Sequence, residues 1–189
     1  MICAIILAAG KSTRMGQPKM LMPWGDTTVL GAVIRTMQHA GVGEIVLVTN
    51  ALIAGNMTDA KIQVVENDNG EMLESLKAGI AAVRPSAEAA LICLGDQPQV
   101  EERSVRSVCE AYRKSKVNLV VPSYHMRRGH PWLIARGLWD EILHMREDET
   151  MRDLLNNHKD EILYVECDTP SILQDLDTPD DYLKYKPTD

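Results

Sequence analysis

A loop rich in glycine and basic residues follows the first apolar segment of the chain. Residues 7–19 read LAAGKSTRMGQPK, and their positive charges come from Lys11, Arg14 and Lys19. The first acidic residue of the chain is Asp26, so no carboxylate within the loop neutralises this charge. Backbone N–H groups of a glycine-containing turn, together with such cations, bind phosphate groups. The loop is therefore predicted to bind an anion, and solvated charges on an ordinary strand-to-helix loop are the alternative.

Two familiar phosphate-binding motifs do not match this loop. Residues 10–12, Gly-Lys-Ser, resemble the end of a P-loop, but that motif requires a glycine where Ile5 stands. The dinucleotide motif G-x-G-x-x-G fails as well, because Gly10 and Gly16 have no third glycine in register. A P-loop nucleoside triphosphatase is therefore disfavoured, and ATP hydrolysis without an acceptor would be the observation that supports it.

Two acidic segments could hold a divalent metal ion. Residues 95–98, Gly-Asp-Gln-Pro, follow an apolar segment, so the Asp96 carboxylate is expected at the carboxyl end of a buried strand. Asp175 and Asp177 flank Leu176 near the C-terminus. Mg²⁺ commonly binds one or two protein carboxylates, while phosphate oxygens and water complete its coordination. Each segment has an ordinary alternative, since aspartate is also common in turns and before helices.

Two further groups of polar residues could contact substrates. Ser75 lies in a helix-like segment, and Arg127, Arg128 and His130 form a second basic cluster. An ordinary helical serine and a solvated loop are the alternatives. His125 and His130 lack partners at the spacing of metal ligands, so a histidine metal site is disfavoured.

Alternating strand-like and helix-like segments predict how these residues are positioned. The expected strands are residues 2–7, 44–49, 62–65, 90–94, 118–122, 132–135 and 162–166, and the expected helices lie near 29–37, 72–83, 105–112, 137–145, 150–158 and after 178. This order predicts an α/β three-layer sandwich around a mostly parallel sheet. Ligands of such sheets bind beyond the carboxyl ends of the strands, where the strand order reverses. The loops after Leu7 and Leu94 are therefore the expected site.

Length and composition narrow the class of protein further. The 189 residues, without a linker-like segment, are expected to form a single domain over residues 1–189. A net charge of −7 disfavours nucleic acid and anionic membranes as partners. No apolar run approaches the length of a membrane span. Four cysteines without a C-x-x-C pair predict buried, reduced thiols and a cytoplasmic protein.

The loop resembles the signature of a known family. The string L-A-A-G-x-S-x-R-M-G-x-x-K after an N-terminal strand is similar to that of the MobA-like/MocA-like nucleotidyltransferases, which act on the molybdenum cofactor. The matching residues are Leu7, Ala8, Ala9, Gly10, Ser12, Arg14, Met15, Gly16 and Lys19. Residues 95–98 resemble the family's metal-binding turn, and residues 175–182 resemble its C-terminal D-x-D-T-P-x-D-Y element. The resemblance implies the nucleotide-diphospho-sugar transferase fold, which is Rossmann-like.

The resemblance also implies an activity. It is the Mg²⁺-dependent transfer of a nucleoside monophosphate, CMP from CTP in the first instance, to the terminal phosphate of molybdopterin, with release of pyrophosphate. Arg14, Lys19 and Asp96 would be catalytic, and Asp96 and Asp177 would hold Mg²⁺. The implied nucleotide contacts are Leu7, Ala8, Ala9, Gly10, Lys11, Ser12, Arg14, Lys19, Gly70, Ser75 and Gly95. The implied acceptor contacts are Arg127, Arg128 and His130, and a molybdoenzyme client is a further expected partner.

Other activities on the same fold stay open at this point. The family's guanylyl branch carries glycine where Ala9 stands, and a Cβ there would narrow the space for a purine, which favours CTP over GTP. A GTP-dependent guanylyltransferase and a sugar-phosphate nucleotidylyltransferase are the enzymatic alternatives. A non-catalytic nucleotide-binding accessory protein is the third, and it would bind nucleotide without releasing pyrophosphate.

Overall fold

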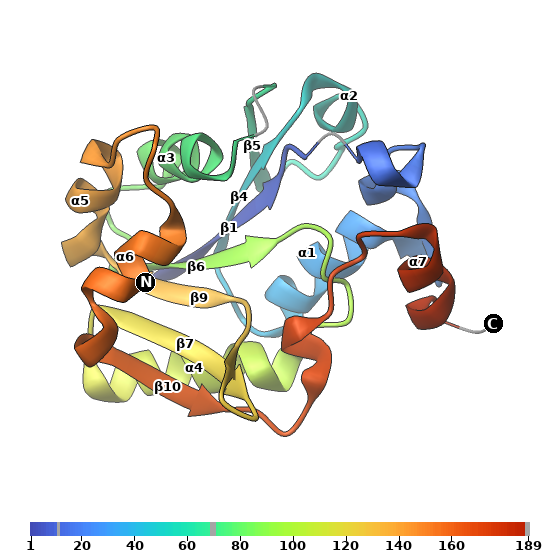
Figure 1. Cartoon of the computed structure of the whole chain (residues 1–189). Coiled ribbons are helices and arrows are strands. Elements are labelled where there is room, and N and C mark those ends of the chain that lie inside the picture. Colours follow the sequence, from blue (N-terminus) through green and yellow to red (C-terminus); the bar gives the residue numbers. More distant parts are fainter. Residues whose placement is uncertain (11, 69–70, 188–189) are drawn as a thin grey trace.

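The computed structural model describes residues 1–10, 12–68 and 71–187, in which strands and helices alternate (Figure 1). The strands are β1 (Ile2–Ala8), β2 (Pro23–Trp24), β3 (Thr27–Thr28), β4 (Glu44–Thr49), β5 (Ile62–Glu66), β6 (Ala89–Leu94), β7 (Leu119–Tyr124), β8 (Arg127–Arg128), β9 (Trp132–Ala135) and β10 (Ile162–Glu166). The α-helices are α1 (Val29–His39), α2 (Ala51–Ala54), α3 (Met72–Ala82), α4 (Glu102–Ser115), α5 (Trp139–His144), α6 (Met151–Asn157) and α7 (Pro179–Tyr185). Lys11 and Gly70, two of the predicted nucleotide contacts, lie outside the described residues.

The main sheet is mostly parallel, as the sequence predicts. Its strand order is β10-β7-β9-β6-β1-β4-β5, and β8 pairs with β7. β1 runs parallel to both of its neighbours, β4 and β6. Because β4 and β5 extend the sheet on one side of β1 and β6 begins the other side, the strand order reverses at β1. The short strands β8 and β9 run antiparallel to their partners, since the chain returns from β7 through a hairpin.

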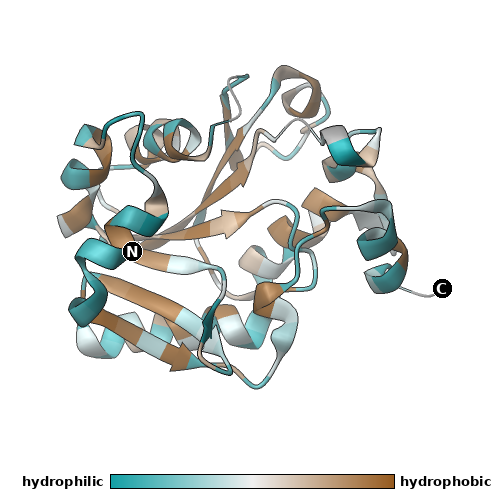
Figure 2. Ribbon diagram, in the orientation of Figure 1, coloured by the Kyte–Doolittle hydropathy of each residue, from teal (hydrophilic) through white to brown (hydrophobic). Residues whose placement is uncertain are grey.

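Helices cover both faces of the main sheet and complete the expected three layers (Figure 1). α1 and α4 pack on the face that carries Ala4 and Ile6 of β1. α3, α5 and α6 pack on the other face, which carries Cys3, Ile5 and Leu7. Successive side chains of a strand point to opposite faces, so β1 is apolar throughout because both faces are buried. Figure 2 shows the same apolar character along the other central strands.

The C-terminal helix α7 lies beside the segment that follows the N-terminal loop (Figure 1). A small apolar cluster joins the two, and its members are Met15, Met22, Trp24, Val29, Leu176 and Tyr182. The Tyr182 hydroxyl donates a hydrogen bond to the Pro23 carbonyl. The helix begins as predicted, with Thr178 as its cap, Pro179 in the first turn and Asp181 completing a capping box. Residues far apart in the sequence are thereby held at one end of the sheet.

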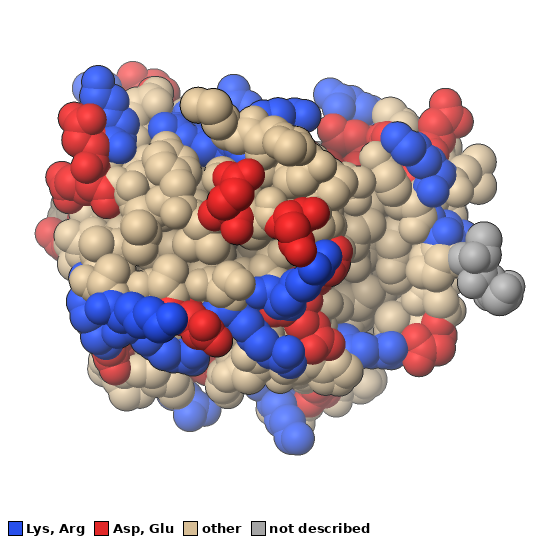
Figure 3. Space-filling model, turned by 90° about the horizontal axis from the view of Figure 1, so that it is seen from below, with Lys and Arg blue, Asp and Glu red and all other residues tan. Residues whose placement is uncertain are grey.

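The thiols are buried, as the sequence predicts. The four cysteines are buried and unpaired, and burial raises the pKa of the Cys3 thiol to about 12. Within the described part of the chain, no helix is long and apolar enough to cross a membrane. On the face drawn in Figure 3, Lys and Arg side chains are interspersed with Asp and Glu.

Gly79→Ala is expected to destabilise the protein, because α3 approaches β1 closely at this residue. A Cβ at Gly79 would lie 2.5 Å from Cγ2 of Ile5 and 3.1 Å from Cγ2 of Val48. Both neighbours are fully buried β-branched side chains with little rotamer freedom, so α3 must shift. We expect the free energy of unfolding in urea to fall by about 1–3 kcal/mol. Gly43→Ala is the control, since the nearest atom to its Cβ is 4.0 Å away. Equal losses in the two variants would contradict the close contact.

Candidate active site

The loops after β1 and β6 meet at the point where the strand order reverses. The backbone N–H of Gly95 donates a hydrogen bond of 2.9 Å to the carbonyl of Leu7. A Cβ at position 95 would lie 2.9 Å from Cβ of Ala8 and 3.2 Å from Sδ of Met20, so a glycine permits this approach. On the other side, the Thr49 hydroxyl donates to the Ala8 carbonyl. The meeting of the two loops, expected from the sequence, is therefore confirmed.

The basic loop is a compact turn with its arginine outside. Ser12 (φ 48°) and Gly16 (φ 67°) are left-handed and flank a short 3-10 turn, Thr13–Met15. The hydroxyl of Ser12 accepts a hydrogen bond from the backbone N–H of Lys19 at 3.3 Å, which closes the loop. Met15 is buried in the cluster shared with α7, whereas the Arg14 side chain is 75% exposed. Arg14 is thus free to reorient toward a ligand.

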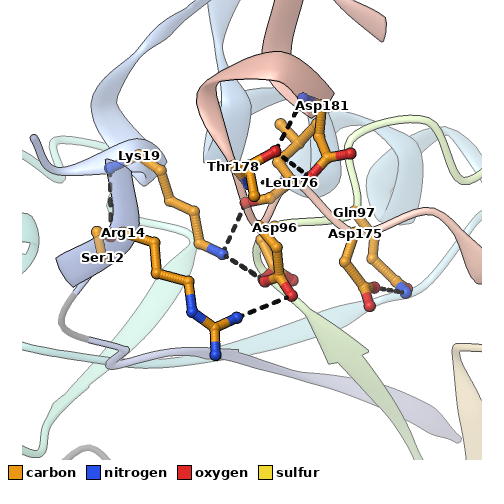
Figure 4. A network of polar contacts seen from close by, with 10 residues as sticks. Ser12, Arg14, Lys19, Asp96, Gln97, Asp175, Leu176, Thr178 and Asp181 are labelled. Atoms are coloured by element: carbon orange, nitrogen blue, oxygen red, sulfur yellow. Dashed lines mark hydrogen bonds and ion pairs between the residues drawn. The ribbon is translucent and has the colours of Figure 1, made fainter. Parts of the chain in front are cut away.

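Lys19 is buried, and its ammonium group lies among oxygens of two other segments (Figure 4). Nζ donates to Oδ2 of Asp96 at 2.7 Å and to the carbonyl of Leu176 at 2.9 Å, and it lies 3.6 Å from Oδ1 of Asp177. Arg14 Nη1 contacts the other oxygen of Asp177 at 3.5 Å. Two carboxylates that are distant in the sequence therefore surround one cation. The role predicted for Lys19, phosphate binding, would require this ammonium group to leave its carboxylates.

Asp175 has a different partner from Asp96 and Asp177. Its carboxylate accepts a hydrogen bond from the side-chain amide of Gln97 (Figure 4). Burial raises the pKa of Asp175, and the neighbouring Asp96 and Asp177 carboxylates raise it further against the opposing effect of the Gln97 hydrogen bond. Leu176, which separates the two aspartates in sequence, is fully buried, and the two carboxylates have different partners. Asp175 is accordingly placed to hold Gln97.

A divalent ion at this site would have two carboxylate ligands from the chain. Asp96 and Asp177 both face the position that Lys19 Nζ now takes. Across the described residues, no group of three or more His, Cys, Asp and Glu side chains is arranged to hold a metal. A two-carboxylate site suits Mg²⁺ that arrives with a triphosphate, because phosphate oxygens and water fill its other positions. The residues present therefore fit such an ion.

Ser75 and the arginines of the second basic cluster have partners other than Lys19, Asp96 and Asp177. Ser75 is buried, and its hydroxyl accepts a hydrogen bond from the side-chain amide of Asn67 at 3.1 Å. Arg127 and Arg128 are exposed on β8, where Arg128 Nε donates to the Tyr164 hydroxyl at 2.9 Å. This contact joins the hairpin to β10. Contacts of Ser75, Arg127 and Arg128 with substrates stay predictions.

His130, the third residue of the second basic cluster, contacts Trp132 and the end of β6. Its ring stacks on Trp132 at 4.3 Å between centroids, and its Nδ1 lies 3.3 Å from the Ile92 carbonyl. Burial lowers the pKa of His130 to about 4, although the Ile92 carbonyl and the charge of Asp96 oppose this shift. His130 is therefore neutral at pH 7 and adds no positive charge for an acceptor phosphate. In the protein without ligand it is a neutral hydrogen-bonding group.

Sequence reasoning missed two contributors to this site. The Leu176 carbonyl binds Lys19, and the Leu176 N–H donates to the Asp96 carbonyl at 3.1 Å. Backbone atoms carry no residue-type signal, so no pattern could identify them. Gln97 could have been found, because it lies inside the acidic turn and its side-chain amide can donate to a carboxylate.

The basic loop faces two carboxylates at the point where the strand order of a mostly parallel sheet reverses. This arrangement is typical of a nucleotide-binding α/β protein. The chain belongs to the MobA-like NTP transferase domain family, which matches residues 4–162. The family resemblance inferred from the loop is thus confirmed, and the protein is a nucleotidyltransferase.

Relatives and solved structures agree with this class. The chain is 29% identical over 194 residues to the molybdenum cofactor cytidylyltransferase of Escherichia coli K12, which covers 98% of this chain and 95% of that protein. It is 27% identical to the nicotine blue oxidoreductase of Paenarthrobacter nicotinovorans, over 94% of this chain and 92% of that one. The crystal structure of Rv0371c from Mycobacterium tuberculosis H37Rv superimposes with a TM-score of 0.82 at 29% identity, covering 100% of this chain and 99% of the other. A manganese complex of the same protein superimposes with a TM-score of 0.80 at 29% identity, covering 98% and 97%.

Proposed function

We propose that the protein transfers CMP from CTP to the terminal phosphate of molybdopterin and releases pyrophosphate, with Mg²⁺ as its metal. The observation that carries the proposal is the convergence of Lys19, Asp96 and Asp177 beside the loop of β1. The near full-length similarity to a molybdenum cofactor cytidylyltransferase supports the choice of substrates. A molybdoenzyme would then be the client of the product.

The reaction needs little covalent chemistry from the protein. An oxygen of the acceptor phosphate forms a bond to the α-phosphorus of CTP, and the bond from that phosphorus to the pyrophosphate oxygen breaks. A phosphate monoester is largely ionised at pH 7, so no general base has to remove a proton. Catalysis then rests on positioning and on cations arranged before the reaction.

The chain's own residues supply these functions in the proposal. Arg14 would turn from Asp177 to the triphosphate and bind it through two donors. Lys19 would then bind a phosphate oxygen through its ammonium group. Asp96 and Asp177 would hold Mg²⁺, which neutralises charge on phosphate oxygens when bound. The backbone N–H groups of residues 10–12 would contact the leaving pyrophosphate, although Lys11 lies outside the described residues. His130, as a neutral ring, would orient the acceptor without contributing charge.

Further parts of the proposal concern the protein as a whole. We propose that residues 1–189 act as one nucleotidyltransferase domain, since both main cores lie on the same sheet. Four unpaired, buried cysteines favour a reducing compartment such as the cytoplasm.

Pyrophosphate release tests the proposed reaction. We expect release from CTP only when molybdopterin and a divalent ion are both present, with less release from GTP and UTP. Mg²⁺ and Mn²⁺ are compared, because a relative's structure contains manganese. Another relative is named as an oxidoreductase, and a redox activity alone would release no pyrophosphate. Pyrophosphate release that depends on a sugar phosphate instead of molybdopterin would show that the protein is a sugar-phosphate nucleotidylyltransferase.

Ala9→Gly is expected to raise the use of GTP relative to CTP. Ala9 is only 4% exposed, so its methyl group belongs to the packed wall at the end of β1. Removing the methyl group frees space there and lets the backbone shift toward the loop. A single methyl group in such a pocket changes the ratio of kcat/KM for two competing substrates by about tenfold or more. We expect a change of about tenfold here. The measurement is the ratio of kcat/KM for the two triphosphates.

Ala81→Gly, at an exposed alanine of α3, is the control for this variant. It removes a methyl group without altering the wall of the site. If the ratio of kcat/KM for GTP and CTP is unchanged in Ala9→Gly, Ala9 does not contribute to selection of the base. A wild-type preference for GTP would overturn the cytidylyl assignment itself.

A further inference from the structure

The ammonium group of Lys19 is held where the carboxylates of the site converge. Two of its three N–H donors are used by Asp96 (2.7 Å) and the Leu176 carbonyl (2.9 Å), and the group also lies 3.6 Å from Asp177. The Lys19 side chain is 10% exposed, so water screens these contacts little. Figure 4 shows the lysine reaching across from the N-terminal loop to the two acidic segments.

The same carboxylates are the proposed ligands of the divalent ion. An ammonium group and a divalent cation repel each other strongly at the distances that a shared pair of carboxylates imposes. Binding of the ion at Asp96 and Asp177 therefore requires Lys19 to give up its present contacts. A lysine that leaves them without a new anion would keep a charge in a largely buried position, which is unfavourable.

A triphosphate can supply that anion. The backbone of Lys19 is fixed by its hydrogen bond to Ser12, and its neighbour Met20 is buried, so the flexible side chain is the part that can move. The exposed Arg14 lies beside the same carboxylates and offers the first contact for incoming phosphates. Phosphate oxygens would then attract Lys19 away from Asp96.

We propose that Lys19 is an internal counter-cation that occupies the metal position until a triphosphate draws it away. The proposal rests on the proposed metal site and extends it: the divalent ion binds weakly alone and tightly together with nucleotide. Such coupling is reciprocal, so the metal also strengthens nucleotide binding. The protein thereby avoids filling its metal site before a substrate is present.

Mn²⁺ binding to the nucleotide-free protein tests this proposal, with the signal of free Mn²⁺ in electron paramagnetic resonance as the readout. Lys19→Met should bind one Mn²⁺ at least about tenfold more tightly than wild type, because Asp96 then lacks its ammonium partner and Asp177 keeps only the exposed Arg14 beside it. The added Asp96→Asn change should remove this tight site. Lys77→Met is the matched control, since Lys77 also contacts one carboxylate, Glu74 at 3.0 Å, and one carbonyl, Met145 at 2.7 Å. It should bind Mn²⁺ as wild type does.

Amine labelling of the wild-type protein gives a second readout that needs no variant at Lys19. Trace acetylation followed by mass spectrometry should show Lys19 protected in the free protein. A large excess of Mn²⁺ should increase its labelling, whereas Lys77 should not change. Unchanged labelling of Lys19 under saturating Mn²⁺ would overturn the proposal even if Lys19→Met failed to fold.

The outcomes separate this proposal from the proposed function. Binding of the Mn²⁺–CTP complex is compared in wild type and in Asp96→Asn. If Asp96→Asn weakens that complex and Lys19→Met does not tighten Mn²⁺ alone, the counter-cation proposal fails and the metal site stands. If Asp96→Asn binds the complex as tightly as wild type, the metal site and the proposal both fail.

Discussion

Replacing Asp96 with asparagine is expected to abolish turnover while leaving the protein folded. The substitution keeps the shape of the side chain and removes the charge that faces Lys19 at 2.7 Å. Loss of residues that merely orient a metal ligand typically costs 10- to 100-fold in activity or metal affinity. Loss of a ligand carboxylate should cost more, so we expect kcat/KM for pyrophosphate release to fall by more than about 10²-fold.

The folded state should survive this change because the cores on both faces of the sheet do not involve Asp96. Lys19 also keeps the Leu176 carbonyl and Asp177 as partners. Circular dichroism and thermal unfolding check this point. Asp168→Asn is the matched control, since Asp168 is an exposed aspartate paired with Arg103 at 2.7 Å. Near-normal activity of Asp96→Asn at saturating Mg²⁺ would remove Asp96 from the metal site.

The local elements of this fold could be predicted because each carries its own signal. β1, β4 and β6 are continuous apolar runs, and α7 has a threonine cap followed by proline. The topological rule for parallel sheets then places the loops after β1 and β6 together. For this reason the basic loop and Asp96 could be assigned to one site before any tertiary contact was known.

The contacts between distant segments could not be predicted in the same way. The contacts of Lys19 with Asp177 and the Leu176 carbonyl depend on where residues 175–177 lie, and Leu176 packs there in a cluster with Trp24 and Tyr182. Hydrophobic residues of this kind indicate burial without naming their partners. Asp175 illustrates the result: in sequence it is equivalent to Asp177, but Gln97 is its partner in the structure.

Arg14→Ala is expected to lower kcat/KM by about 10²- to 10³-fold with little effect on stability. The Arg14 side chain is 75% exposed, and its ion pair with Asp177 spans 3.5 Å. Exposed pairs of this kind contribute about 0–1 kcal/mol, so the free energy of unfolding should change by no more than that. The expected loss in rate is the one typically seen when an enzyme loses one preorganised hydrogen-bond donor that stabilises the charge of the transition state.

Arg14→Lys distinguishes charge from geometry at the same position. A guanidinium binds two phosphate oxygens through a planar fork, whereas an ammonium group acts as a point charge. If the charge alone matters, Arg14→Lys should recover most of the activity that Arg14→Ala loses. We expect only partial recovery, because the turn between the left-handed residues Ser12 and Gly16 orients the two donors of the guanidinium group, and lysine has no such pair. Arg103→Ala, at another exposed arginine in an ion pair, is the control and should keep wild-type activity. Full activity in Arg14→Ala would leave Lys19 as the cation that binds the triphosphate, and the exposed arginine would then serve only to hold Asp177.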